Sequence, residues 1–421
     1  MVDCKPNDEK HTGGIMGIPR SVTRAVLALA AGVALAASPA PAAELPSDGV
    51  YADHIDWGVI MDLSGPASAS QIIWTTGFKD YIRMTNEAGG INGRKINLLI
   101  EDNRFDPSID RISFEKLANQ TPVLGISGMG NANGQVALMS LIRRGRVPVL
   151  GSYTTARALT EPPTPMFYGG FCGYKEMAQV GVGFLSDRLK LKGPKVVTVH
   201  LDTAGGKEYA DYVGEAVLRD GGTHKAVAIK PGAADATAQV LEIISAKPDF
   251  IAVHGTTTTP ILLLRAMQQY GLTTPVFGMA YIGTPVVYNS LPPEAGNNYS
   301  FVSCFTPGGT DDTPALKAMG ERADKFGHPA MKDDLNFVAG WTIGQLVTEA
   351  IAKLGPDVSR EKLVAMLNKG FGIDSKGLSA PISYTSDNHR GLVELKPFGY
   401  DYEAHRFKAY GTYEDYRRYL R

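Results

Sequence analysis

The fold class is most clearly indicated by residues 61–107, MDLSGPASASQIIWTTGFKDYIRMTNEAGGINGRKINLLIEDNRFDP. It reads as the end of an apolar strand, a loop of small polar residues, a helical segment, a glycine pair and a second apolar strand. Gly89 and Gly90 are typical of the end of a helix, and Asp106 followed by Pro107 is typical of the start of the next one. This order predicts a βαβ unit with two parallel strands.

Within the first helical segment, an apolar stripe marks the side that faces a core. Trp74, Phe78 and Ile82 are spaced four residues apart, so they lie on one face of a helix. We expect this stripe to be buried. Trp74 also lies close enough to the preceding loop to contact a ligand.

The alternation of strands and helices continues along the chain. Thr259 followed by Pro260 predicts another helix start, with Thr259 as the N-cap, and Gly221–Gly222 predicts a helix end. The predicted strands are HIDWGVIM (54–61), KINLLIED (95–102), PVLGISG (122–128), VPVLGSY (147–153), KVVTVHLD (195–202), FIAVHGT (250–256) and PVFGMAY (275–281). We therefore predict an α/β fold with mostly parallel sheets.

Residues 1–42 are predicted to be a secretory signal peptide. Arg20 and Arg24 precede the apolar run 25–37, and residues 40–42, Ala-Pro-Ala, form a small-x-small cleavage site. A run of about 13 apolar residues is too short for a transmembrane anchor, which needs roughly 20. The true start of translation is either Met1 or Met16, because the polar leader before Met16 is unusual for a signal peptide. No cysteine follows the apolar run directly, so we expect a soluble periplasmic protein without a lipid anchor.

The composition and the motifs exclude several classes of function. A net charge of −1 over 421 residues gives no positive field to attract nucleic acid. GMGNANG (128–134) has one residue too many for a dinucleotide fingerprint, and the sequence has no phosphate loop, nucleophile elbow, H-E-x-x-H or C-x-x-C motif. We therefore expect no nucleic-acid partner, no cofactor, no metal site and no catalytic residues.

The cysteines and histidines form no motif of their own. Cys4 would leave with the signal peptide, and the remaining pair, Cys172 and Cys304, is interpreted most simply as two buried thiols. A disulfide between them is the alternative. His200 and His254 end predicted strands, where a ligand contact is possible, but a core or rim position is the simpler interpretation.

The opening stretch also resembles a known family. LSGPASAS (63–70), NEAGGINGRKINLLIEDNRFDP (86–107) and GLTTPVFG (271–278) are similar to the leucine/isoleucine/valine-binding type of periplasmic solute-binding protein, whose members serve ABC transporters. The likeness covers residues 53–415.

The resemblance implies a type I architecture, with two doubly wound parallel-sheet lobes joined by a three-segment hinge. We place the three crossings near residues 169–173, 303–307 and 380–384. Lobe I would then comprise residues 44–171 plus 305–382, and lobe II would comprise residues 172–304 plus 383–421.

The resemblance and the loops at the predicted strand ends together give a set of candidate ligand-binding residues. In open parallel sheets, ligands bind beyond the carboxyl ends of the strands, where helix N-termini present free amides. The candidates are Ser64, Trp74, Gly130, Asn131, Ser152, Tyr153, Thr154, Thr155, Tyr174, Glu176, Asp202, Thr256, Met279, Ala280 and Tyr281.

The family pattern assigns roles to some of these residues. Gly130–Asn131 and residues 152–155 match the family's two carboxylate-binding loops. At the turn from Met279 to Tyr281, amino-acid binders carry a Glu that pairs with the ligand's ammonium group, and this chain has no acid there. Glu176 or Asp202 would have to replace that Glu.

These observations predict the solute-binding component of an ABC importer, a monomer whose partners are a small-molecule ligand and the cognate permease of the inner membrane. The ligand would be a small carboxylate or amide, and branched-chain or other amino acids, aromatic or other organic acids, and amides all stay open. A ligand-sensing periplasmic domain of the same fold is the alternative function, and an exported enzyme is the third.

Overall fold

The computed structural model describes residues 48–154, 157–310 and 313–420. The predicted signal peptide, the alternative start at Met16 and the candidate site residue Thr155 lie outside these residues. None of the helices in the described residues is long and apolar enough to cross a membrane.

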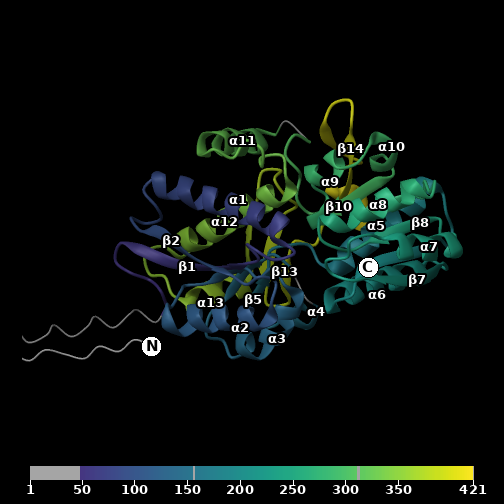
Figure 1. The fold of residues 1–421 in the computed structure, drawn as a ribbon. Coiled ribbons are helices and arrows are strands. Elements are labelled where there is room, and N and C mark those ends of the chain that lie inside the picture. Colours follow the sequence, from purple (N-terminus) through teal and green to yellow (C-terminus); the bar gives the residue numbers. More distant parts are fainter. Residues whose placement is uncertain (1–47, 155–156, 311–312, 421) are drawn as a thin grey trace, which may run out of the picture. The chain divides into compact units, whose positions relative to one another are not determined.

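The first sheet contains five parallel strands in the order β2-β1-β3-β4-β5. Helices α1 and α12 pack together on one side of β1 and β2, and α2 and α3 pack together on the other side (Figure 1). The strands are β1 (His54–Met61), β2 (Lys95–Asp102), β3 (Ile126–Gly128), β4 (Val149–Ser152) and β5 (Phe167–Gly169). The helices are α1 (Ser68–Glu87), α2 (Pro107–Glu115), η1 (Lys116–Gln120), α3 (Ala132–Arg143), α4 (Arg157–Thr160), α11 (Pro314–Phe326), α12 (Leu335–Leu354) and α13 (Arg360–Gly370).

The second sheet contains seven strands in the order β15-β14-β10-β9-β8-β6-β7. Its core from β10 to β7 is parallel, and β14 and β15 add an antiparallel edge that the sequence patterns did not predict. The strands are β6 (Lys195–Leu201), β7 (Thr223–Ile229), β8 (Phe250–Val253), β9 (Val276–Gly278), β10 (Tyr299–Ser303), β14 (Lys396–Asp401) and β15 (Arg406–Ala409). The helices are α5 (Tyr174–Leu189), α6 (Ala204–Arg219), α7 (Thr237–Ala246), α8 (Thr258–Gln269), η2 (Ala280–Ile282), α9 (Pro285–Asn289), α10 (Pro293–Gly296), α14 (Tyr413–Tyr416) and η3 (Arg417–Tyr419).

A third, antiparallel sheet of three strands lies beside β5. It is formed by β11 (Phe371–Ile373), β12 (Ile382–Thr385) and β13 (Asn388–Gly391), and β13 contacts β5. The chain then enters the second sheet at β14. The predicted α/β fold with parallel-sheet cores is confirmed, and a strand is present in each of the seven predicted strand segments.

The predicted helix boundaries are confirmed in one case and wrong in another. α2 begins at Pro107, and the Asp106 carboxylate accepts a hydrogen bond of 2.7 Å from the Ser108 amide. The N-cap of α8 is Thr257 and not Thr259. Thr259 already lies in the first turn of α8, where its hydroxyl accepts a 3.2 Å hydrogen bond from the amide of Thr256, the residue before the N-cap.

The glycine pairs end their helices as predicted. α1 ends at Glu87 and α6 ends at Arg219, and in each case a single C-cap residue separates the helix from its glycine pair. At Gly90 the backbone has a φ of +76°, and an added Cβ would overlap the Arg94 carbonyl oxygen, so this turn requires glycine.

Cys172 and Cys304 form a disulfide, so the simpler interpretation of two thiols is wrong. Their Cα atoms lie 5.8 Å apart, within the range that a disulfide spans. Cys172 follows β5 of the first sheet and Cys304 follows β10 of the second. The bond therefore links the chain segments that leave the two sheets.

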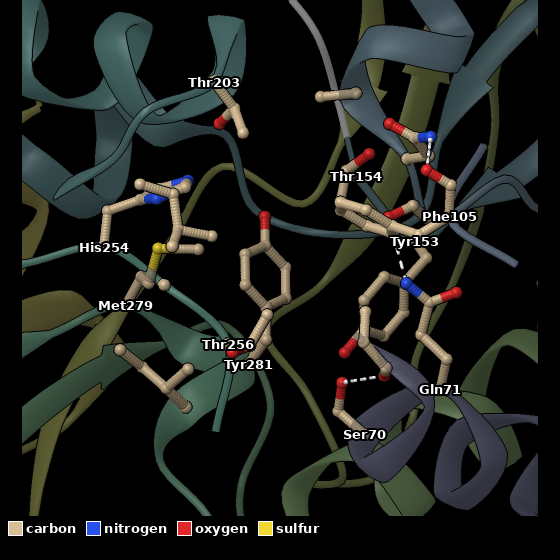
Figure 2. A pocket seen from close by; sticks show the side chains of 18 of the residues that line it. Ser70, Gln71, Phe105, Tyr153, Thr154, Thr203, His254, Thr256, Met279 and Tyr281 are labelled. Carbon is tan, nitrogen blue, oxygen red and sulfur yellow. Dashed lines mark hydrogen bonds between the residues drawn. The ribbon is translucent and has the colours of Figure 1, made fainter. Parts of the chain in front are cut away.

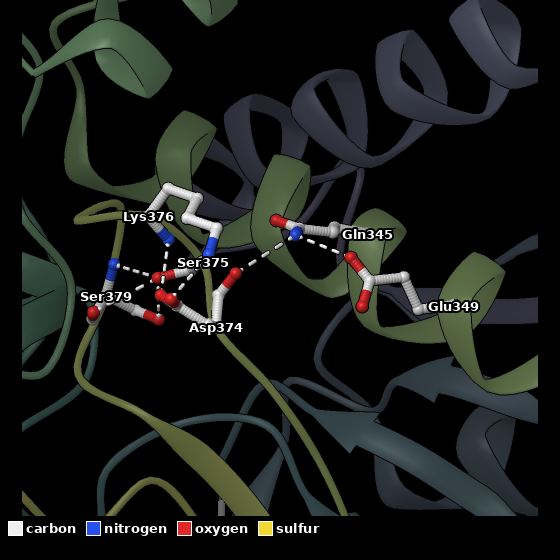
Figure 3. A network of polar contacts seen from close by, with 6 residues as sticks. All are labelled: Gln345, Glu349, Asp374, Ser375, Lys376 and Ser379. Atoms are coloured by element: carbon white, nitrogen blue, oxygen red, sulfur yellow. Dashed lines mark hydrogen bonds and ion pairs between the residues drawn. The ribbon is translucent and has the colours of Figure 1, made fainter.

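A polar network holds the loop between β11 and β12 against α12 (Figure 3). The Gln345 amide on α12 donates to the Asp374 carbonyl oxygen over 3.5 Å, and the Ser379 backbone amide donates to the Ser375 hydroxyl over 2.8 Å. Phe305 and Ser379 form an antiparallel bridge, so this loop also lies beside the segment that follows β10.

Candidate functional site

A pocket lies where the carboxyl ends of strands from both sheets meet. Segments that follow β1, β2, β3 and β4 form one wall, and segments that follow β5, β6, β8 and β9 form the other. Its cavity volume is about 60 Å³. Figure 2 shows side chains from both walls directed toward this space. The position agrees with the general rule for ligand sites of open parallel sheets.

Eight of the predicted site residues line this pocket. They come from the loops after β3, β4, β5, β8 and β9, so the fold brings together parts of the chain that are far apart in the sequence. These residues are Gly130, Asn131, Tyr153, Thr154, Tyr174, Thr256, Met279 and Tyr281.

The other described candidates lie away from the pocket for different reasons. Ser64 donates a 2.6 Å hydrogen bond to Asp102 at the exposed start of the first loop. Ser152 is buried below the pocket, where its hydroxyl accepts from Gln135 over 2.8 Å. Asp202 is exposed at the end of β6 and does not line the pocket.

Trp74 and Ala280 are core residues. Trp74 is fully buried, stacks on Phe78 with ring centroids 5.3 Å apart, and meets the edge of Tyr153, which itself lines the pocket. It therefore supports the pocket from behind. Ala280 is buried at the start of η2, and its amide faces the Met177 sulfur at 3.5 Å.

Glu176 is engaged in an ion pair and does not line the pocket. Its Oε1 lies 2.5 Å from Nη1 of Arg390, and only 6% of its side chain is exposed. Arg390 belongs to β13, so this pair connects α5 with the third sheet. A ligand in the pocket does not meet this carboxylate.

Several pocket residues were missed by the sequence patterns. They are Ala67, Ser70, Gln71, Phe105, Ala132, Asn133, Leu201, Thr203, Gly205, His254, Gly255, Thr257 and Ile282. His254 follows β8, so the interpretation as a core or rim histidine missed its place on the pocket. A general signal was present, because most of these residues lie between the last residue of a strand and the first turn of the following helix.

Gln71 shows how the first wall is held in place. Its Oε1 accepts from the Asp62 amide over 2.7 Å, and its Nε2 donates to the Gly130 carbonyl oxygen over 3.0 Å. An added Cβ at Gly130 would overlap the Gln71 amide group. A side chain at position 130 would therefore displace the Gln71 amide group from its two hydrogen bonds.

Tyr153 and Tyr281 are held by a residue of α12. The Tyr153 hydroxyl donates a 2.7 Å hydrogen bond to Asn336 Oδ1, and Asn336 Nδ2 lies 3.4 Å from the Tyr281 carbonyl oxygen. The rings of Tyr153 and Tyr281 are 5.3 Å apart, and that of Tyr174 lies 6.4 Å from Tyr281. These three tyrosines give the pocket an aromatic wall.

The side chains that line the pocket are uncharged. Among the described lining residues there is no Asp, Glu, Lys or Arg. Burial lowers the pKa of His254 to about 3, so its imidazole is neutral at physiological pH. Burial also raises the pKa of Tyr153, Tyr174 and Tyr281 above the ordinary value, which keeps their hydroxyls protonated. Within the described residues, no cluster of His, Cys, Asp or Glu could hold a metal ion.

Known proteins resemble this chain in sequence and in fold. A family model described as periplasmic binding protein matches residues 55–396. The Leu/Ile/Val-binding protein homolog 3 of Brucella melitensis is 27% identical over 288 residues, which make up 67% of this chain and 71% of that protein.

Two solved structures share the fold. The fatty acid ABC transporter substrate-binding protein from Thermomonospora curvata has a TM-score of 0.78 at 21% identity. The match covers 86% of this chain and 93% of that protein's chain. The second is a branched chain amino acid ABC transporter from Thermus thermophilus with bound valine, which has a TM-score of 0.75 at 18% identity. The match covers 85% of this chain and 95% of that protein's chain. The chain belongs to the periplasmic binding protein family and is of the Leu/Ile/Val-binding type.

Proposed function

We propose that this protein is the extracytoplasmic solute-binding component of an ABC importer. The observation that carries the proposal is the pocket, which is lined by strand-end loops of two separate sheets. Its described lining offers hydroxyls, amides, aromatic rings and one neutral histidine. A coupled nucleophile and base, which an enzyme would need, is not among them. The protein therefore holds a small carboxylate or amide ligand and releases it unchanged.

The two larger sheets are the cores of two lobes in this proposal. The first two crossings stay at residues 169–173 and 303–307, which the Cys172–Cys304 disulfide joins. We place the third crossing at residues 392–395 in place of 380–384. The reason is that β12 and β13 pair with each other beside β5, whereas β14 belongs to the second sheet.

Ligand binding would close the two lobes by rotation about these crossings. A ligand in the pocket contacts both walls only when the walls are close together, so it stabilises the closed state over the open one. The permease of the inner membrane would recognise the closed, loaded protein. Residues 1–42 would direct export, and the protein would act in the periplasm as a monomer without a cofactor.

The test uses the chain from residue 43 onward. Mass spectrometry of the extracted protein should identify a co-purified small molecule, and small-angle scattering should show a smaller radius of gyration after that molecule is added back to stripped protein. Tyr281→Ala should weaken binding, whereas Tyr270→Ala, at an exposed position outside the pocket, should not. Tight binding with an unchanged radius of gyration would argue against closure.

A further inference from the structure

The first observation concerns the helices around the pocket. The N-terminal ends of α1, α3, α5, α6 and α8 all contribute lining residues, among them Ser70, Asn131, Tyr174, Thr203 and Thr257. Each of these helices has at least 12 residues. The first amides of a helix lack partners within the helix and carry partial positive charge. The pocket therefore favours a negatively charged or electron-rich group.

The second observation is a pair of buried polar side chains without good partners. His254 is 5% exposed, and its Nδ1 has no hydrogen-bond partner among the described residues. Tyr281 is 6% exposed. Its hydroxyl interacts electrostatically with Tyr174 but makes no hydrogen bond of standard geometry. Buried polar groups almost always have a hydrogen-bond partner, so we expect a polar group of the ligand to bind these two side chains.

The third observation is that no carboxylate is among the described residues that line the pocket, and that three acids near it already have partners. Asp202, at the end of β6, is exposed and does not line the pocket. Glu176 pairs with Arg390, and the Glu208 carboxylate accepts the Arg157 amide over 3.1 Å. The Asp334 carboxylate accepts both the backbone and the side-chain amide of Asn336. None of these acids lines the pocket. A ligand ammonium group would be desolvated there without a negative partner, which is strongly unfavourable.

We propose that the ligand is a small carboxylate whose second polar group is an uncharged hydroxyl or carbonyl, and that this group is bound by Tyr281 and His254. This inference rests on the proposed function and specifies its ligand. The carboxylate lies at the convergent helix N-termini, and the uncharged group supplies the partner that the tyrosine and the histidine lack.

The pocket volume indicates a small ligand. It is about 60 Å³, well above the roughly 10–15 Å³ that a single water molecule needs, so the pocket has room for a small organic molecule. Lactate, pyruvate and alanine are small compounds of nearly equal size. Compounds of equal size that differ only in the second polar group can therefore be compared.

The test is calorimetry with two matched series. The three-carbon series contains L-lactate, pyruvate, propionate, L-alanine and lactamide. The five-carbon series contains 2-hydroxyisovalerate, 2-oxoisovalerate, isovalerate and L-valine, and it allows for a larger cavity in the loaded protein. In at least one series, we expect the hydroxy or oxo acid to bind more than about tenfold tighter than the amino acid, a difference of about 1.4 kcal/mol. Lactate should also bind more tightly than lactamide.

A second measurement tests the assigned side chain. Tyr281→Phe removes only the hydroxyl, so the preference for the hydroxy or oxo acid over the unsubstituted acid should fall by at least about fivefold. An unchanged preference would overturn the assignment of Tyr281.

The outcomes separate this inference from the proposed function. If the amino acid binds equally or more tightly in every series that shows binding, the inference is overturned and the protein remains a solute-binding protein for amino acids. Stronger binding of lactamide would likewise overturn it in favour of an amide. Binding of none of these compounds would also overturn the inference, while the identification of a co-purified ligand tests the proposed function independently.

Discussion

At Glu176, one buried carboxylate connects α5 with β13. Its partner Arg390 is 2.5 Å away, and Glu161 approaches the same guanidinium group at 3.9 Å. We expect Glu176→Gln to lower the free energy of unfolding by about 1–3 kcal/mol, because Arg390 loses its closest negative partner. The affinity for the ligand should stay the same, since Glu176 does not line the pocket. Urea denaturation and calorimetry measure the two quantities.

Glu161→Gln is the control for this variant. Glu161 is more distant from Arg390 and 31% exposed, so its loss should cost less than about 1 kcal/mol. If Glu176→Gln loses ligand affinity while its stability is unchanged, Glu176 binds the ligand after all.

Asp110 on α2 gives a prediction about pH. Burial raises the pKa of its carboxyl group to about 7, whereas an unfolded Asp titrates near 4. Between these values the folded protein keeps a proton that the unfolded chain releases, so the free energy of unfolding falls as the pH rises from about 4 to about 7. In Asp110→Asn, the free energy of unfolding should fall by about 2–4 kcal/mol less than in the wild type over this pH range.

Chemical denaturation at pH 4.5 and pH 8 measures this effect. Glu115→Gln, a carboxylate-to-amide change at a more exposed position of the same helix, should leave the pH dependence as in the wild type. Parallel curves for Asp110→Asn and the wild type would show that Asp110 is ionised in the folded protein throughout this range.

Between elements, the packing of α1 on α12 depends on two glycines. An added Cβ at Gly340 would overlap the Trp74 carbonyl oxygen, and one at Gly77 would overlap the Phe337 carbonyl oxygen. The two backbones therefore touch, and a side chain can be added only if the helices separate. We expect Gly340→Ala to lower the free energy of unfolding by about 1–3 kcal/mol despite the better helix propensity of alanine.

Gly320 on α11 is the matched control for this prediction. An added Cβ there would meet its nearest atom, a Lys332 side-chain carbon, at 3.7 Å, which is an ordinary contact. Gly320→Ala should therefore raise the stability by up to about 1 kcal/mol. Equal effects of the two substitutions in thermal unfolding would argue against close backbone packing of α1 on α12.

For the whole molecule, the disulfide between Cys172 and Cys304 is the main covalent constraint. It closes a loop with a sequence separation of 132 residues, which limits the freedom of the unfolded chain. We expect the double variant Cys172→Ser/Cys304→Ser to lose about 2–5 kcal/mol of unfolding free energy while it keeps the ligand pocket, whose described lining includes neither cysteine.

Thiol titration checks the bond directly. In the chain from residue 43 onward, unfolded without reductant, we expect no free thiol, and two after reduction. Two free thiols in the unreduced sample would show that the bond is absent from the protein as purified.

The sequence alone was sufficient for the elements that form locally. β1 and β2 occupy the predicted residues, and the start of α2 follows its Asp-Pro cap. Apolar periodicity and capping act within a few residues of the chain, so a single sequence displays them. The disulfide and the pairing of β14 with β10 were not determined in this way, because they depend on partners that are distant in the sequence. The pairs β12–β13 and β14–β15 were missed although their partners are close in the sequence.

The same division applies to the pocket. The sequence indicated which loops would follow the strand ends, and eight of its candidate residues line the pocket. Which side chains within those loops face the pocket depends on how the helices and loops pack in three dimensions. Tyr174 and Glu176 are two residues apart in the first turn of α5, and one lines the pocket while the other pairs with Arg390. Each helical residue turns the side chain by about 100°, so the rotation of a packed helix, which long-range contacts set, decides between ligand contact and ion pair.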